Sequence, residues 1–260
     1  IMSKKMAEGL DALVLDVKIG TGAFMRKESD ALKLAESLVK TGNAFKVKTE
    51  AVISDMNQPL GKYVGNALEV FECLKLLRNE SDLQMQPTLD LSIELAARIL
   101  VLTGISDSIE TAKSKIQNVL ASGEALEKFR QNIELQGGNP KICDAPEFLL
   151  EKNLVEVKIQ SPASGYVLEI DAAEIGKAIS EIGGGRMKIE DKIDFAVGYA
   201  GDKKLGDKVE EREPFGTLFC RSESQTAKVF AKLQTAYKIG EEKPEEEFSL
   251  IKEIVRTRIN

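Results

Sequence analysis

Residues 54–72 combine the end of a strand, a tight loop and a helix, and this stretch constrains the fold most strongly. The apolar, β-branched run 47–53 before it is typical of a buried strand. A loop with Pro59 and two glycines follows, and Asn66 then precedes apolar residues at helical spacing, so Asn66 is the predicted N-cap. In α/β proteins, this order of strand, loop and helix places ligands at the carboxyl end of the strand.

The same loop has a composition that suits a cation. Its bends point several backbone carbonyls inward, and Glu69 and Glu72 follow on the helix. Carbonyl and carboxylate oxygens are the ligands that hard cations prefer. The alternative is a tight connection followed by two solvated glutamates, and the residues alone leave both interpretations open.

The first half of the chain alternates between strands and helices. A strand at 12–19, a helix at 28–41 and a strand at 45–53 form a β-α-β unit, which favours a parallel pair of strands. The strand at 12–19 is nearly continuous in its apolar residues, as expected for burial on both faces. Apolar residues at helical spacing predict further helices at 1–9, 66–78, 89–103, 106–121 and 123–136.

The composition changes near residues 145–152, where we expect a domain boundary. Beyond it, alternating and apolar runs predict strands, and two amphipathic runs predict helices. The expected strands are 153–160, the residues after a turn at 161–167, 193–199 and 214–219, and the expected helices are 172–182 and 226–240. The tail from Lys243 is charged and then mildly apolar.

Composition argues against several classes of protein. The net charge of −6 disfavours a nucleic-acid-binding surface, and no apolar run reaches the ~18 residues that a membrane span needs. The cysteines, Cys73, Cys143 and Cys220, are widely spaced and typical of reduced thiols, so we expect a cytoplasmic protein. The chain has no histidine, so its chemistry falls to carboxylates, lysine, arginine or hydroxyls, or to residues outside these 260.

A glycine pair after the first strand invites a dinucleotide-binding interpretation. Gly20 and Gly22 form a Gly-x-Gly sequence, but Met25 stands where the fingerprint needs a third glycine. No acidic residue lies at the end of a second strand at the distance that this fingerprint expects. The pair is therefore a weak signal for such a cofactor.

Two long strings of residues carry a family resemblance. The first runs from Lys4 to Met25 and reads Lys-Lys-Met-Ala-Glu-Gly-Leu-Asp-Ala-Leu-Val-Leu-Asp-Val-Lys-Ile-Gly-Thr-Gly-Ala-Phe-Met. The second contains Ser-Asp-Met-Asn-Gln-Pro-Leu-Gly from Ser54 and Val-Gly-Asn-Ala-Leu-Glu-Val from Val64. Shorter strings continue it at 161–167, 183–186, 191–198 and 205–209. In this order they resemble the pyrimidine nucleoside phosphorylases, the family that includes thymidine phosphorylase.

The resemblance implies phosphorolysis of pyrimidine nucleosides, with thymidine and uridine as candidate substrates and phosphate as co-substrate. The products would be the free base and (2-deoxy)ribose 1-phosphate, which is the reaction of a pentosyltransferase in pyrimidine salvage. No organic cofactor is implied. Members of the family are homodimers, so a homodimer is the expected assembly.

The resemblance also implies a domain organisation. Residues 1–10 match the last helix of a small helical domain, 11–150 match an α/β domain, and 151–260 match a C-terminal α+β domain. The expected fold class is α/β, a mixed sheet with flanking helices, followed by an α+β part whose strands resemble a barrel-sandwich. The other helices of the small domain and the phosphate-binding segment are expected upstream of Ile1, so residues 1–260 alone are predicted to be inactive.

Five residues match ligand-binding positions of the family. Lys4, the best catalytic candidate, matches a lysine at the pyrimidine carbonyl, where a cation suits the negative charge on the leaving base. Phe24 matches an aromatic residue of the nucleoside pocket. The carbonyls of Leu60 and Tyr63 and the carboxylate of Glu72 match a monovalent-cation site, with potassium as the expected ion. The family often has a small residue in place of Tyr63, but a backbone carbonyl tolerates that change.

Other interpretations of these residues, without a role in the phosphorylase reaction, remain open. Without the resemblance, Lys4 would be a solvated lysine, and Phe24 would be a core residue. Residues 161–167 and 206–209 also resemble two edges of a biotinyl or lipoyl carrier domain, yet Lys188 precedes the Gly-Asp-x-Val turn instead of following it. The alternatives to an enzyme are therefore a barrel-sandwich carrier or binding module and a nucleotide-binding homologue without activity.

Overall fold

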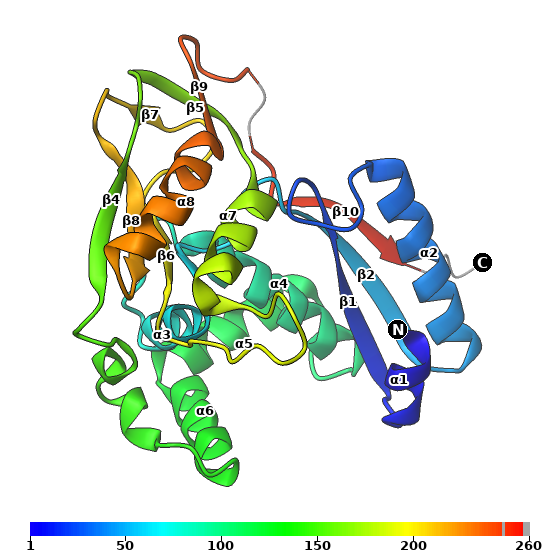
Figure 1. Ribbon diagram of the computed structural model, residues 1–260. Coiled ribbons are helices and arrows are strands. Elements are labelled where there is room, and N and C mark those ends of the chain that lie inside the picture. The colour runs from blue at the N-terminus through cyan, green and yellow to red at the C-terminus, as the bar shows by residue number, and fades with distance from the viewer. Residues whose placement is uncertain (246–247, 257–260) are drawn as a thin grey trace. The chain divides into compact units, whose positions relative to one another are not determined.

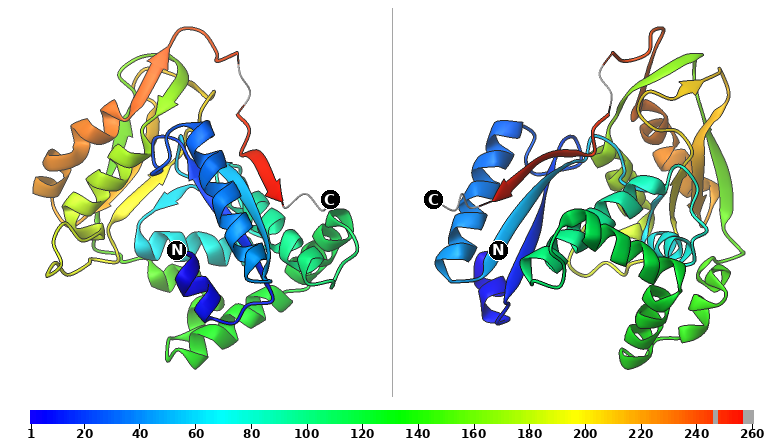
Figure 2. Two further views of the ribbon diagram at one scale, coloured as in Figure 1. Left: turned by 90° about the vertical axis from the view of Figure 1, so that its right-hand side faces the viewer. Right: turned by 180° about the vertical axis from the view of Figure 1, so that it is seen from behind.

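The computed structural model describes residues 1–245 and 248–256, which form two compact units. The first unit contains the described residues of 1–56, 88–119 and 249–260, and the second contains those of 57–87 and 120–248. Figures 1 and 2 show the helices and strands of both. Within the described ranges, no helix is long and apolar enough to cross a membrane.

The first unit is built on a three-stranded mixed sheet. Its elements are α1 (Met2–Ala7), β1 (Ala12–Ile19), α2 (Glu28–Ala44), β2 (Lys48–Asp55), most of α4 (Gln86–Leu102) and of α5 (Ile109–Ala121), and β10 (Ile251–Arg256). The strand order is β1-β2-β10. β1 and β2 are parallel, which confirms the predicted pair, and β10 is antiparallel to β2.

Buried apolar side chains hold α2 against one face of this sheet (Figure 1). Val17 and Ile19 of β1 alternate toward the helix, because side chains two residues apart on a strand share a face. Ala31 of α2 is fully buried and small enough for a close approach. Near its end the helix is closer still, since a Cβ on Gly42 would meet Thr49 Oγ1 at 2.0 Å.

The edge strand β10 is a feature that the sequence does not predict. The pattern indicates only a mildly apolar tail, whereas residues 251–256 pair with β2 from Ser54 to Glu50. Val255 is buried in the core under α2, and the other side chains of β10 are exposed or half-buried. With one buried apolar residue, the strand lacks the alternation by which strands are recognised.

A buried ion-pair network attaches α4 and α5 to the opposite face of β2. The Arg98 side chain is 3% exposed and bonds to Glu50 of β2 at 2.9 Å and to Glu94 of α4. Lys113 of α5 pairs with Glu94 at 2.6 Å. Each buried charge meets an opposite charge, so removing one member of the network leaves an excess of the opposite charge.

The second unit contains two antiparallel sheets and their covering helices. Its elements are β3 (Tyr63–Val64), α3 (Asn66–Leu77), α6 (Glu124–Leu135), the 3₁₀ turns η1 (Pro140–Cys143) and η2 (Pro146–Leu149), β4 (Val155–Gln160), β5 (Gly165–Ile170), α7 (Ala172–Ile179), the π turn η3 (Ser180–Gly184), β6 (Gly198–Gly201), β7 (Lys208–Val209), β8 (Pro214–Cys220), α8 (Glu223–Thr235) and β9 (Tyr237–Gly240). The strand orders are β3-β6-β8-β4 and β7-β5-β9.

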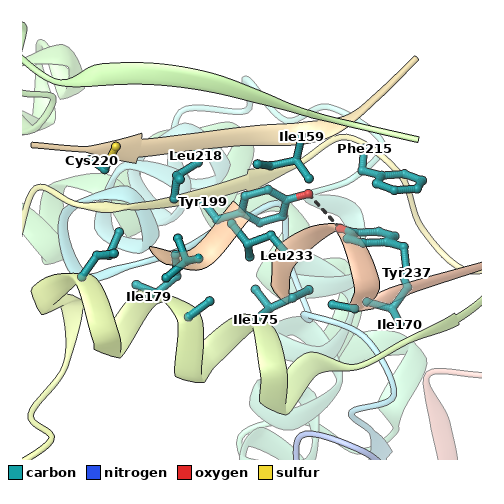
Figure 3. Packing of buried hydrophobic residues seen from close by; sticks show 14 of the residues in the cluster. Ile159, Ile170, Ile175, Ile179, Tyr199, Phe215, Leu218, Cys220, Leu233 and Tyr237 are labelled. Carbon is teal, nitrogen blue, oxygen red and sulfur yellow. Dashed lines mark hydrogen bonds between the residues drawn. The ribbon is translucent and has the colours of Figure 1, made fainter. Parts of the chain in front are cut away.

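The core of the second unit lies between these strands and the helices α7 and α8 (Figure 3). Ile175 of α7 and Leu233 of α8 are fully buried beside Tyr199 of β6. The Tyr199 hydroxyl donates to the Tyr237 hydroxyl at 3.1 Å, and Phe215 stacks on the Tyr237 ring at 4.3 Å between centroids. The core therefore contains a hydrogen bond between two buried hydroxyls.

Two predicted elements of this unit are wrong in part. The sequence predicts one helix over 226–240, but α8 ends at Thr235 and Tyr237 begins β9. Tyr237 and Ile239 pair with β5, so strand pairing overrides the helical spacing of these residues. The predicted strand 193–199 begins only at Gly198, where pairing with β8 starts.

The chain thus has a mixed α/β fold with several sheets. The compact units are discontinuous in sequence, whereas the predicted boundaries, 1–10, 11–150 and 151–260, describe a division along the chain. Those boundaries stay a prediction.

Acid is expected to weaken the first unit through Glu94. Burial alone raises the pKa of this carboxyl, but Lys113 and Arg98 outweigh it and leave the pKa below its ordinary value of 4.5. A depressed pKa contributes stability above the unfolded-state pKa that is lost as pH falls through the folded-state pKa. The free energy of unfolding should therefore decline below pH 4.5, as urea denaturation across a pH series would measure.

The matched variants for this test are Glu94→Gln, which removes the titrating group, and Glu156→Gln on the exposed side of β4. We expect Glu94→Gln to show a smaller loss of stability in acid than the wild type, and Glu156→Gln to follow the wild type. Identical pH profiles for all three proteins would contradict the role of Glu94.

The tyrosine pair allows a test of the second core. Tyr199→Phe leaves the buried Tyr237 hydroxyl without its partner, so we expect a loss of about 1–3 kcal/mol in the free energy of unfolding. Removing both hydroxyls in Tyr199→Phe/Tyr237→Phe should cost less than the sum of the two single variants. Additive losses in chemical denaturation would show that the hydroxyls do not interact.

Candidate functional site

The loop between β2 and α3 presents consecutive backbone carbonyls to one ammonium group. Lys204 Nζ donates to the carbonyl oxygens of Pro59 at 2.6 Å, Gly61 at 2.6 Å and Leu60 at 3.4 Å. A lysine ammonium has three N–H donors, so it can serve all three oxygens. The carbonyls of this loop do converge, as the bends in the sequence predict.

The N–H groups that follow in the same loop meet a buried carboxylate. Glu72 of α3 is 3% exposed, and its Oε2 accepts from the backbone N–H groups of Lys62 and Tyr63, each at 2.9 Å. Leu68 precedes Glu72 by four residues, so both lie on the buried face of the helix. Without the carboxylate, two N–H groups would lose their partner, at a cost of about 1–3 kcal/mol each if they stayed buried.

Two opposite charges therefore bind the backbone of this loop. The Lys204 ammonium binds its carbonyl groups, and the Glu72 carboxylate binds its N–H groups. Burial lowers the pKa of Lys204 to about 8, and the charge of Glu72 opposes the shift. Lys62 forms ion pairs with Asp82 at 2.9 Å and with Asp202 at 3.3 Å. Burial alone lowers the pKa of Lys62, but these carboxylates outweigh it and leave the pKa above its ordinary value.

The potassium predicted at Leu60, Tyr63 and Glu72 can be tested against these contacts. The Leu60 carbonyl already accepts from the Lys204 ammonium, and the Glu72 carboxylate already accepts from two N–H groups. In the described part of the chain, no cluster of three or more Asp, Glu or Cys side chains could hold a metal ion. As arranged here, Leu60 and Glu72 already bind protein donors, and the potassium assignment stays a prediction.

The start of α3 corrects the predicted N-cap. Gly65, with φ of 134°, occupies the N-cap position, and Asn66 is the first helical residue. The Asn66 side chain instead donates to the Gly184 carbonyl at 2.9 Å. A Cβ on Gly65 would meet the Val197 carbonyl at 2.6 Å, so the site needs glycine for both its φ and its close approach. Glu69 accepts from the Gly65 N–H at 3.1 Å and completes the cap.

A polar cluster lies near the carboxyl ends of β1 and β2 in the first unit. Lys18 Nζ donates to Ser54 Oγ at 3.0 Å and pairs with Asp16 at 2.8 Å, and the Ser54 hydroxyl donates to Asp16. Ser54 is fully buried, while Lys18 and Asp16 are partly exposed. These residues point away from α2, because Val17 between them points toward it. The cluster offers an ammonium and a carboxylate to a ligand at this edge.

The glycine loop after β1 leaves Phe24 in solvent. Gly20 has φ of 127°, and its N–H bonds to the Met25 carbonyl at 3.1 Å, which closes a short turn. The Gly22 N–H donates to the Met56 carbonyl at 3.0 Å. This bond joins the loop after β1 to the residue that follows β2. Phe24, at the tip, is 103% exposed. Core packing, the alternative role for Phe24, is therefore wrong in the described structure.

Three of the predicted site residues lie together in the second unit, and the other two lie in the first unit. Leu60, Tyr63 and Glu72 lie together on one loop and helix of the second unit. Lys4 is exposed on α1 and precedes the amino end of β1, whereas Phe24 follows its carboxyl end. A strand of eight residues spans about 25 Å. The described residues do not bring Lys4 and Phe24 into contact.

Sequence reasoning missed Lys204 and the cluster around Ser54. Lys204 lies in a charged turn with Lys203, and nothing local distinguishes the buried lysine from the solvated one. The cluster had a signal, because Asp16 and Lys18 interrupt an otherwise apolar strand. Polar residues within such a strand call for partners, and the register opposite β2 supplies Ser54.

Two family models match the chain in order. Residues 1–126 match the glycosyl transferase family, a/b domain, and residues 166–240 match the pyrimidine nucleoside phosphorylase C-terminal domain. The second match lies inside the region 151–260 that the sequence assigns to the C-terminal part.

Curated relatives match across both regions. A pyrimidine-nucleoside phosphorylase of Bacillus subtilis (strain 168) is 43% identical over 242 residues, which is 93% of this chain and 55% of the relative. A pyrimidine-nucleoside phosphorylase of Staphylococcus aureus (strain USA300) is 43% identical over 218 residues, 84% of this chain and 49% of the relative. The chain spans about half the length of the curated relatives that it matches.

The contacts of Glu72 predict a large effect on stability. Glu72→Ala leaves the Lys62 and Tyr63 N–H groups without their acceptor and the Lys204 charge without its counterpart. We expect a loss of about 2–5 kcal/mol in the free energy of unfolding. Chemical denaturation monitored by circular dichroism measures it.

The matched control is Glu69→Ala, on the exposed side of the same helix. Glu69 accepts one backbone hydrogen bond at the helix start, so its loss should cost about 1 kcal/mol. If both variants lost equal stability, the buried carboxylate would have no special role in this loop.

Proposed function

This chain belongs to the pyrimidine nucleoside phosphorylase family, and from that premise we propose that the protein containing it cleaves pyrimidine nucleosides with phosphate. The observation that carries the proposal is the 43% identity over 93% of the chain to an enzyme named for this activity. Both family models match in the same order, and this excludes a likeness confined to one shared domain.

The reaction exchanges one bond at the sugar. A phosphate oxygen forms a bond to C1′ as the bond from C1′ to the pyrimidine nitrogen breaks, and the electron pair leaves with the base. The base takes up the proton that the phosphate gives up, so the products are the free base and a pentose 1-phosphate. The protein contributes mainly by positioning the two reactants and by stabilising the charge that develops on the base.

Lys4 is the proposed partner of the departing base. Lys4 is exposed on α1, so a ligand can reach its ammonium. A positive charge at a pyrimidine carbonyl stabilises the base more in the transition state than in the nucleoside, because negative charge develops there. The exposed ring of Phe24 is the proposed apolar contact of the nucleoside.

The proposal extends to the setting of the enzyme. We place it in the cytoplasm, in pyrimidine salvage, as a homodimer whose small helical domain and α/β domain enclose the substrates. The β-rich part around β5 and β8 would serve as a barrel-sandwich scaffold without an attached cofactor. The potassium predicted at Leu60, Tyr63 and Glu72 takes part in no step of this reaction.

The direct test is release of thymine from thymidine and of uracil from uridine by the full-length gene product. We expect base only when phosphate is present, and an equal amount of pentose 1-phosphate. Lys4→Ala should lower kcat/KM by about 100-fold or more, the usual cost of removing a group that stabilises developing charge.

The control is Lys5→Ala, which removes the neighbouring ammonium and its 3.7 Å ion pair with Glu8. This variant should retain nearly full turnover. Base release without phosphate would make the enzyme a hydrolase, and no release from either nucleoside would favour the nucleotide-binding homologue instead.

A further inference from the structure

We propose that the Lys204 ammonium is the cation of the loop at residues 59–63, and that this loop needs no metal ion. The loop offers three carbonyl oxygens to one positive charge, and Lys204 Nζ lies within 2.6–3.4 Å of all of them. An ammonium and a potassium ion carry the same charge and are similar in size. Of the three residues that the family resemblance assigns to potassium, the lysine contacts the Leu60 carbonyl, and it brings a positive charge to the same loop.

The turn that carries Lys204 is fixed in position by its own hydrogen bonds. The Lys204 N–H donates to the Asp207 carboxylate at 2.8 Å, and the Asp207 N–H returns a bond to the Lys204 carbonyl at 3.1 Å. The Leu205 N–H donates to the Gln58 side chain at 2.9 Å, which ties the turn to the loop. A tethered charge is present at the site at a high effective concentration, unlike an ion from solution.

Several carboxylates act on the Lys204 ammonium. Glu72, the carboxylate that accepts from the loop N–H groups, opposes the lowering of the Lys204 pKa more than Asp207 and Asp82 do. A metal ion at the Leu60 carbonyl would lie beside the ammonium, and like charges at such short range repel strongly where solvent is scarce. The ammonium therefore opposes a metal ion at the Leu60 carbonyl.

The first measurement uses the full-length wild-type protein. Its thermal unfolding midpoint is followed while potassium chloride replaces choline chloride at constant ionic strength. If Lys204 fills the site, the midpoint should change by less than about 1 °C, because potassium finds no place to bind. A saturable rise of several degrees would show that the native loop binds potassium, and it would overturn the proposal.

The second measurement removes the ammonium. Lys204→Met keeps a long apolar side chain but leaves the three carbonyls without a donor. In choline chloride its midpoint should lie about 4 °C or more below the wild type, and potassium should restore part of that loss by entering the vacated site. The matched control is Lys203→Met, which removes the adjacent ammonium and its 2.6 Å ion pair with Glu213.

Lys203→Met should show the same small response to potassium as the wild type. The proposal is overturned if Lys204→Met and Lys203→Met have equal midpoints and equal responses to potassium. If Lys204→Met does not fold, the wild-type titration still decides, because it needs no variant. Neither measurement depends on enzymatic activity, so failure of the proposed reaction would leave this inference intact.

Discussion

The conformation of the loop between β2 and α3 depends on one ammonium group that binds its carbonyls and one carboxylate that binds its N–H groups. Three converging carbonyls cannot bond to one another, so they need a donor with several hydrogens. Lys204 supplies these hydrogens, and Glu72 accepts from the N–H groups that follow. Both groups come from outside the loop, so its conformation depends on the fold of the second unit as well as on its own bends.

The parts of the fold that follow from sequence are those with strong local patterns. The parallel pair β1 and β2 is predictable because apolar runs flank an amphipathic helix. β9 and β10 are not, because Tyr237 continues a helical spacing and β10 buries only Val255. In both strands the pairing partner, rather than the local residues, decides the structure.

The candidate site also has a part that the sequence predicts and a part that it does not. Pro59, the glycines and Glu72 predict a loop that takes a positive charge, and the carbonyls do converge on one. The source of that charge was not predictable, since Lys204 is 144 residues from Leu60 and resembles its solvated neighbour Lys203. A sequence pattern states what a loop requires, but the element that meets the requirement emerges only from the tertiary structure.

The measurement that tests this account most directly is anomalous scattering from a crystal of the full-length protein soaked in rubidium, a heavier substitute for potassium. With Lys204 as the resident cation, we expect the ammonium in contact with the carbonyls of residues 59–61 and no rubidium peak beside them. A rubidium ion bound by Leu60, Tyr63 and Glu72, with Lys204 turned away, would contradict the account.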